Sequence, residues 1–483
     1  MHSREVERFP HYFLEGSGNL SINPENHNIF KKRRIKNMKR RLMSAILAVS
    51  MTASLAACAS SGTPEGTTAG ESQKSAGEAA TTAAGDSSDA VEIKIWSPTD
   101  EVGIENWWTE KIAQWNSDHP EIQVTREAID RADSYAYENK ITTATTSNDL
   151  PDILFVDGPT VSYYAANQTI IPIDEVWSDE DKKDFMPSSV QQNTYDNHMY
   201  AIGPTESSVA LYYNKDYLDA AGIPYPSDSN IEDAWTWTEF YENAKKLTTA
   251  DYVGTNIIMD KGEGLIYALE PFFLENGASF VSEDGSKAEG YVNSDAMVET
   301  MNYLNKFIQE GIANIDPVKD EFLNGKAATM LGGSWNIADL EKSDLNWGVS
   351  YYPVSDDHKA VSPTGDWTAA VTKDCKNPEA AMEVLKWLFN TDNVAAYASA
   401  IAKPASRTSA YEKMEGWDNG VRALFLWQLQ NTGVARPSTP SYSVLSQGFA
   451  TAILNVFSGT EAKSELDTVA ADFEEDYETY YGN

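Results

Sequence analysis

The chain is poor in cysteine and histidine. Two cysteines among 483 residues exclude a framework of disulfide bonds. Six histidines, three of them within the first 27 residues, leave little material for zinc binding or serine–histidine catalysis. His119, His198 and His358 are isolated from one another, and no H-E-x-x-H, paired C-x-x-C, EF-hand or P-loop pattern occurs. We therefore expect no metal site and no bound cofactor.

Basic residues are also scarce. The chain carries 37 Lys and Arg against 73 Asp and Glu, a formal charge of −36, and shows no basic arm after its first 41 residues. Nucleic acid is therefore not an expected partner. By contrast, 13 Trp and 24 Tyr are present, and such amphipathic rings either pack in a core or stack on ligands.

The apolar run near the N-terminus is too short to hold a protein across a bilayer. It lies in "MKRRLMSAILAVSMTASLAAC", which has a basic start, about ten apolar residues and a small-residue stop before Cys58. The run resembles a bacterial lipoprotein signal, whose processing leaves a lipidated cysteine as the new N-terminus. We assign the signal to residues 38–57 and expect residues 1–37 to be an upstream extension that is absent from the mature fold.

A tether follows the cysteine. Residues 59–90 contain no aromatic residue and no Leu, Ile, Val or Met, so they cannot bury enough apolar surface to offset the chain entropy. We expect residues 58–90 to be a lipidated cysteine with a disordered linker, which reaches about 30 Å r.m.s.. The folded part should begin near Val91.

Strand and helix patterns alternate after that point. The sequences "VEIKIW", "PEIQVTREAI" and "PDILFVDG" predict strands, the last of them buried and parallel, and a helix-like stretch spans 108–115. A capping box at 236–239 and an Asn-Pro-Glu start at 377–379 predict two further helices. This alternation indicates βαβ units and an α/β fold.

Seven stretches, in this order, resemble the extracellular solute-binding proteins of carbohydrate ABC importers (family 1, the group of maltose-binding protein). They are "TEKIAQWNSDHPEIQVT", "SNDLPDILFVDG", "YDNHMYAIGPTE", "VALYYNKDYLDAAGIPYP" with "TWTEF", "NGKAATMLGGSWNIADL", "KNPEAAMEVLKWL" and "SGTEAKSEL". The fourth is the most specific, although Pro204 stands where the family has a hydrophobic residue. The resemblance covers roughly residues 91–480.

The resemblance implies a two-lobed periplasmic-binding-protein-like fold (type II), in which each lobe is a mainly parallel sheet flanked by helices. Lobe 1 would take residues 91–203 and 365–412, and lobe 2 would take 204–364 and 413–480, with a hinge between them. The ligand would lie in the cleft, at the carboxyl ends of the strands.

Trp335 is the first candidate for ligand binding. It follows two glycines in "GKAATMLGGSWN", where Asn336 breaks the G-x-S-x-G turn of a nucleophilic serine. The matching Gly-x-Trp of the family carries a tryptophan that stacks on a sugar, and core packing is the alternative. The other candidates follow predicted strands, adjoin the expected hinge or carry polar groups suited to sugars: Trp96, Asp100, Glu101, Asp157, Glu206, Tyr267, Asp366, Trp367, Arg407 and Tyr442. For Asp157, a turn cap is the alternative.

The pattern favours a monomeric, lipid-anchored receptor on the outer face of the cell membrane. It would deliver a carbohydrate, an oligosaccharide, to an ABC permease, and the sequence does not identify the sugar. A secreted glycoside-active enzyme or a surface adhesin is the alternative. A glycosidase needs two carboxylates at a set separation, and in so acidic a chain carboxylate pairs are uninformative.

Cys58 should carry the lipid, and residues 1–57 should be absent from the mature protein, because the small-residue stop before Cys58 is the processing signal. Mass spectrometry of the N-terminus of protein taken from its native membrane tests this expectation. An intact N-terminus or an unmodified Cys58 would contradict it.

Overall fold

The structure is a computed structural model, and it describes residues 90–99, 104–130 and 136–482. The predictions for Cys58, for residues 1–57, for the linker 58–89, and for Asp100 and Glu101 lie outside the described residues.

The first sheet has five strands in the order β2-β1-β3-β12-β6. Their bounds are β1 (Val91–Pro98), β2 (Ile122–Ile129), β3 (Ile153–Asp157), β6 (Ala201–Ile202) and β12 (Trp367–Val371). Strand β1 pairs in parallel with β2 and β3, whereas β12 is antiparallel to β3 and β6.

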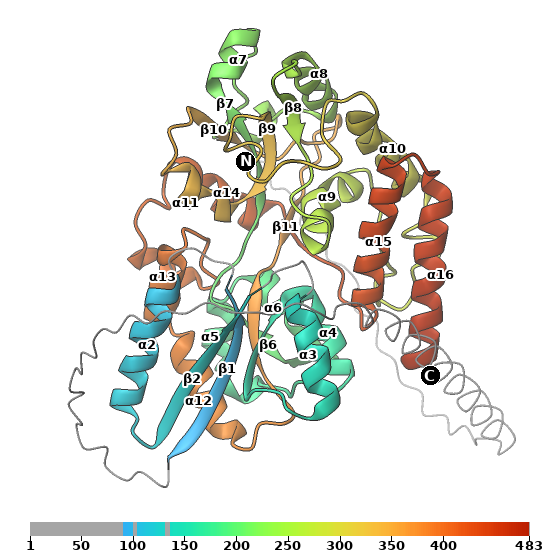
Figure 1. The fold of residues 1–483 in the computed structure, drawn as a ribbon. Helices are drawn as coiled ribbons and strands as arrows, with labels where there is room; N and C mark the ends of the chain where they lie inside the picture. The colour runs from blue at the N-terminus through green and yellow to red at the C-terminus, as the bar shows by residue number, and fades with distance from the viewer. Residues whose placement is uncertain (1–89, 100–103, 131–135, 483) are drawn as a thin grey trace, which may run out of the picture. The chain divides into compact units, whose positions relative to one another are not determined.

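Helices cover both faces of the first sheet, so its strands are apolar on both sides (Figure 1). One face packs against α2 (Ile104–Asp118), α12 (Pro378–Leu388) and α13 (Thr391–Ala400). The other face packs against α3 (Ala136–Ser147) and α4 (Val161–Ala166), and α5 (Asp179–Asp184) and α6 (Pro187–Gln192) follow along the chain.

The second sheet has four strands in the order β10-β7-β9-β8. Their bounds are β7 (Val209–Asn214), β8 (Val253–Asn256), β9 (Ala327–Gly333) and β10 (Trp347–Ser350). Figure 1 shows this sheet in the upper part of the ribbon. The remaining helices are α7 (Lys215–Ala221), α8 (Trp237–Leu247), α9 (Glu263–Glu275), α10 (Asp295–Gln309), α11 (Ile337–Leu340), α14 (Gly420–Asn431), α15 (Tyr442–Phe457) and α16 (Ala462–Tyr480).

Short pairings lie where the chain passes between the sheets. Strand β11 (Ser362–Thr364) pairs in parallel with β13 (Gly433–Ala435), and an isolated bridge joins Thr205 to Ala405. A separate hairpin joins β4 (Thr194–Tyr195) to β5 (His198–Met199). The strands of the first sheet lie within 91–203 and 365–412, and those of the second lie within 204–364. We keep these ranges, with 413–480, as the proposed lobes.

Most local predictions are confirmed. The three predicted strands are β1, β2 and β3, and the helix-like stretch at 108–115 belongs to α2. Helix α8 has the predicted capping box, with Phe240, Ala244 and Leu247 buried. Asn377 precedes Pro378 at the start of α12, but its side chain makes no capping hydrogen bond.

The fold class is confirmed, and each sheet is mainly parallel, with one reversed strand, β12 in the first sheet and β7 in the second. Strand β7 is antiparallel to both β9 and β10, so β8, β9 and β10 run in one direction and β7 runs against them. The physical reason is the direction of entry. Strands β7 and β12 begin at the crossings and run away from the other sheet, whereas β3 and β9 run toward it.

Among the described residues, the helices lack the combination of length and apolarity that a membrane span requires.

Candidate functional site

A cavity of about 530 Å³ lies between the two sheets. Its lining includes Asp157 at the end of β3, Asn256 at the end of β8 and Gly332 near the end of β9. These strands therefore present their carboxyl ends to one space, as expected for a ligand site in an α/β fold. Trp367, the first residue of β12, completes the side that the first sheet contributes.

The two glycines of "LGGSWN" make room for an aromatic platform. Trp335 is half-buried in a 3-10 turn that directly follows β9, and its indole lines the cavity. A Cβ atom at Gly333 would lie 2.1 Å from carbons of the Trp335 ring. Glycine is therefore required at 333 by the close approach of this ring and not by an unusual φ, which is −96°.

Trp335 also touches residues from other elements. Its ring centroid is 5.9 Å from that of Tyr267 and 5.8 Å from the Lys403 ammonium. Lys403 makes a buried ion pair with Asp366, at 3.1 and 3.2 Å to the two carboxylate oxygens. Thr205 donates a further hydrogen bond of 2.7 Å to Asp366. The platform is therefore set in a charged, hydrogen-bonded frame.

Arg436 joins the two sides of the cavity through side chains from both. Its Nη1 and Nη2 donate to the two oxygens of Asp157 at 2.9 and 2.6 Å, and Nη1 also donates to Glu263 at 2.6 Å. Asp157 ends a strand of the first sheet, and Glu263 begins α9, which packs beside the second. The Arg436 side chain is only 3% exposed. A buried guanidinium of this kind is tolerated because its charge is neutralised on both sides.

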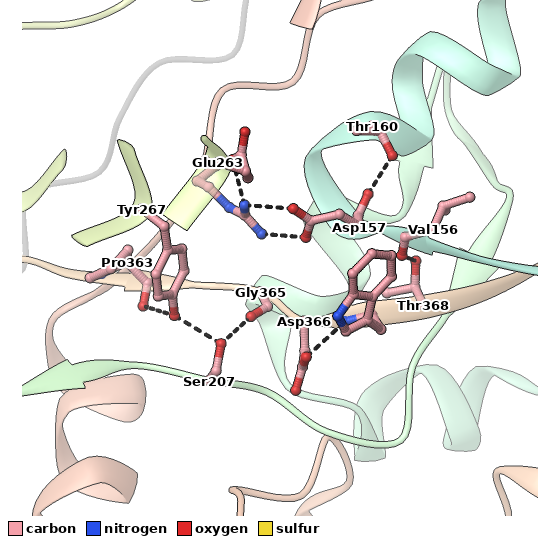
Figure 2. A network of polar contacts seen from close by, with 12 residues as sticks. Val156, Asp157, Thr160, Ser207, Glu263, Tyr267, Pro363, Gly365, Asp366 and Thr368 are labelled. Atoms are coloured by element: carbon pink, nitrogen blue, oxygen red, sulfur yellow. Dashed lines mark hydrogen bonds and ion pairs between the residues drawn. The ribbon is translucent and has the colours of Figure 1, made fainter. Parts of the chain in front are cut away.

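Glu263 and Tyr267 both lie in the first half of α9. Glu263 also accepts hydrogen bonds from Tyr442 and Ser446, and burial raises the pKa of its carboxyl despite the opposing charge of Arg436. The Tyr267 and Ser207 hydroxyls are 2.9 Å apart, and Ser207 donates to the carbonyl of Gly365 (Figure 2). Burial raises the pKa of the Tyr267 hydroxyl well above its usual range.

Glu206 lies behind the cavity, in the first crossing between the sheets. Its carboxylate accepts hydrogen bonds from Ser189 and, at 2.8 Å, from the backbone N–H of Gly365. The residue is 2% exposed, and burial raises the pKa of its carboxyl to about 7, although these hydrogen bonds lower it. The position of Glu206 favours a role in holding the crossing strands together.

The structure brings five of the predicted site residues to the cavity: Asp157, Tyr267, Trp335, Asp366 and Trp367. Trp96, Glu206, Arg407 and Tyr442 lie outside its lining. Trp96 is buried against α3 beneath the Lys140 ammonium. Arg407 pairs with Asp181 and Asp184 at 2.9 and 3.0 Å, and Tyr442 donates to Glu263.

Sequence reasoning missed Arg436, Glu263 and Lys403. The sequence offers one sign of Arg436: it directly follows a short Gly-Val-Ala strand in "TGVARPS". An arginine at the end of a strand can reach other residues at the edge of a sheet. Glu263 and Lys403 carry no comparable local pattern. In the part of the chain that the structure describes, no group of three His, Cys, Asp or Glu side chains is placed to hold a metal ion.

The chain belongs to the bacterial extracellular solute-binding protein family, because the sequence profile of that family matches residues 100–395, more than half of the chain. It is 23% identical over 318 residues to the maltodextrin-binding protein MdxE of Bacillus subtilis (strain 168), covering 61% of this chain and 72% of that protein. It is 20% identical over 381 residues to a maltooligosaccharide ABC transporter solute-binding lipoprotein of Streptococcus pneumoniae (strain ATCC BAA-255 / R6). That match covers 76% of this chain and 84% of that protein.

Solved structures share the fold. An ABC substrate-binding protein of Listeria monocytogenes in complex with cycloalternan superposes with a TM-score of 0.69 at 20% identity, covering 80% of this chain and 100% of that one. A maltose-bound binding protein of T. maritima gives a TM-score of 0.69 at 19% identity, with the same coverage. At this level of identity, the similarity establishes the two-lobed fold.

Arg436→Ala should destabilise the protein by about 3–5 kcal/mol, because it removes the counterion of two largely buried carboxylates, Asp157 (18% exposed) and Glu263 (15% exposed). Arg422→Ala is the matched control, since Arg422 makes a comparable two-point pair with the exposed Glu341, and about 0–1 kcal/mol is expected there. Denaturant unfolding of both variants measures the difference. Equal losses would contradict a structural role for the Arg436 pairings.

The free energy of unfolding should fall between pH 5 and 7 in the wild type, and Glu206→Gln should make this fall smaller. The folded pKa of about 7 lies above the ordinary value of 4.5, so the folded state holds a proton that the unfolded state has lost. Glu206 therefore makes its full contribution to stability below about pH 4.5. This contribution, of the order of 3 kcal/mol, is lost as the pH rises through 7.

Melting temperatures of wild type and Glu206→Gln across this pH range give the comparison. Glu310→Gln is the control, because Lys245 lowers the pKa of the exposed Glu310 carboxyl and the effect of that group falls at acid pH. Parallel wild-type and Glu206→Gln curves would show that Glu206 is already ionised in the folded state.

Proposed function

We propose that this chain is the substrate-binding component of an ABC importer and that it binds an oligosaccharide in the cavity between its lobes. The observation that carries the proposal is the platform of Trp335, held by Gly333 at the carboxyl end of β9. A sugar ring offers a C–H face to an indole and hydroxyls to polar side chains. The names of the relatives, a maltodextrin-binding protein and a maltooligosaccharide solute-binding lipoprotein, support the same ligand class.

Binding would use both lobes. Asp157 and Trp367 line the cavity from the first sheet, and Asn256 and Trp335 line it from the second. A ligand that touches all four stabilises the closed arrangement relative to an open one, because those contacts exist together only when the lobes are close.

Delivery to the permease would take place at the outer face of the membrane. We propose that the Cys58 lipid holds the receptor there as a monomer and that a separate ATPase drives import. We also propose that the protein has no hydrolytic activity, because its relatives are named as binding proteins and the sequence carries no specific catalytic motif.

A thermal-shift screen of the mature chain against neutral oligosaccharides tests the proposal, because a ligand that binds the native state raises its melting temperature. At least one saccharide should bind without release of shorter products. Failure of every saccharide to bind folded protein would overturn the proposal, and steady product release that is lost on mutating one carboxylate would favour a glycosidase.

Trp335→Ala should weaken binding of a saccharide from this screen by about 1–3 kcal/mol, because the stacking and apolar contact of the platform are lost. Gly333→Ala should act in the same direction, because its Cβ would displace the ring. Calorimetric titration measures the affinity, and unfolding measures the stability of each variant.

Trp237→Ala is the control. Trp237 is half-buried in α8, stacks on Tyr303 and lies outside the cavity lining, so its loss should cost stability and leave affinity unchanged. A core tryptophan costs about 3–5 kcal/mol of stability on truncation. A loss of that size in Trp335→Ala with unchanged affinity would make Trp335 a packing residue.

A further inference from the structure

The charges around the cavity are strongly one-sided. Among the described residues, its lining contains seven carboxylates (Asp157, Asp260, Glu263, Asp320, Glu321, Asp339 and Asp366) and three cations (Lys319, Lys403 and Arg436), a formal excess of four negative charges. An excess of this sign repels an anionic ligand at the entrance. Whether an anion could still bind inside depends on what the cations already contact.

Arg436 is the cation with the greatest capacity for an anion, and its terminal nitrogens are already engaged. Nη1 is shared between Asp157 and Glu263, and Nη2 is bonded to Asp157. A phosphate or carboxylate that replaced Asp157 would leave that carboxylate, now 18% exposed, without its counterion. Truncating or displacing one partner of a buried pair is costly because the other charge remains buried.

The other two cations offer no better partner. Lys403 contacts both oxygens of Asp366, and the two side chains are only 4% and 6% exposed. Lys319 is exposed in the segment at the rim, where water and salt screen its charge. An anionic ligand would therefore meet carboxylates before it met an available positive charge.

The same lining suits a neutral polyol. Carboxylate oxygens accept hydrogen bonds from sugar hydroxyls, and the lining also contains Asn256 and Asn336 beside the Trp335 platform. On the basis of the proposed function, we infer that the cavity selects uncharged saccharides against phosphorylated or carboxylated ones, and that Asp157 enforces the choice by occupying Arg436. This selection is by negative interaction, since the acidic analogue keeps most of the hydroxyls and adds a charge that the site repels.

Calorimetric titration of the mature wild-type chain with matched pairs of neutral and acidic sugars tests the selection. The pairs are galactotriose with trigalacturonate, maltose with maltose 1-phosphate, and any other neutral sugar that binds with its uronate or phosphate. Each acidic member should bind at least about tenfold more weakly than its neutral partner.

Equal or tighter binding of the acidic member would overturn the inference and leave the proposed function standing. Binding of neither member in any pair or panel, by protein that melts cooperatively, would overturn the proposed function itself.

Two variants test the role given to Asp157. Asp157→Asn should raise affinity for the acidic member relative to the neutral one by about tenfold, because Arg436 loses its principal counterion. Asp339→Asn is the matched control, because it makes the same change of charge at an exposed position on the same cavity, and it should shift the ratio by less than about threefold.

Both ratios are measured on folded protein, with the neutral sugar as an internal reference, so a general loss of stability does not imitate the effect. Equal shifts in the two variants would show that the overall field, and not the occupied Arg436, determines the choice.

Discussion

The buried guanidinium of Arg436 is the interaction on which the arrangement of the site depends. It is bonded to Asp157, at the end of a strand of the first sheet, and to Glu263, at the start of a helix beside the second. A charge 3% exposed to water needs both partners, so the ends of these two elements are held together at one side of the cavity. Arg436 itself follows β13, which pairs with β11 beside the crossings. The pairings therefore connect the crossing strands, the first sheet and helix α9 beside the second sheet through one side chain.

The aromatic side of the cavity depends on a different constraint, which is space. Gly333 leaves the volume that the Trp335 ring occupies, and Lys403 and Tyr267 border that ring. The result is a platform next to the second sheet that shares the cavity with Trp367 and Asp157 of the first sheet. Charge and shape thus act together in the proposed function: the paired cations leave hydroxyl-binding acceptors in excess, and the indole supplies the apolar face that a sugar ring needs.

The sequence predicts those features of the fold and the site that depend on residues close together in the chain. Strand alternation, the capping box of α8, the last residue of β3 and the turn after β9 are local features, and the sequence predicts them. Glu206 and Arg407 were assigned to the ligand because their types suit sugars, yet each lies outside the cavity and makes distant pairings, to Gly365 and to Asp181. The sequence does not reveal the role of Arg436, because its partner Asp157 is 279 positions away along the chain. The reversed direction of β7 in the second sheet also depends on the crossing of the chain, which no local pattern encodes.

A crystal structure of the mature chain with a neutral oligosaccharide from the screen tests the account most directly. The account predicts a sugar ring stacked on the Trp335 indole within the cavity, hydroxyls bonded to carboxylates of the lining, and Arg436 still paired with Asp157 and Glu263. A sugar bound elsewhere, or one whose binding separates Arg436 from Asp157 to make room for itself, would contradict it.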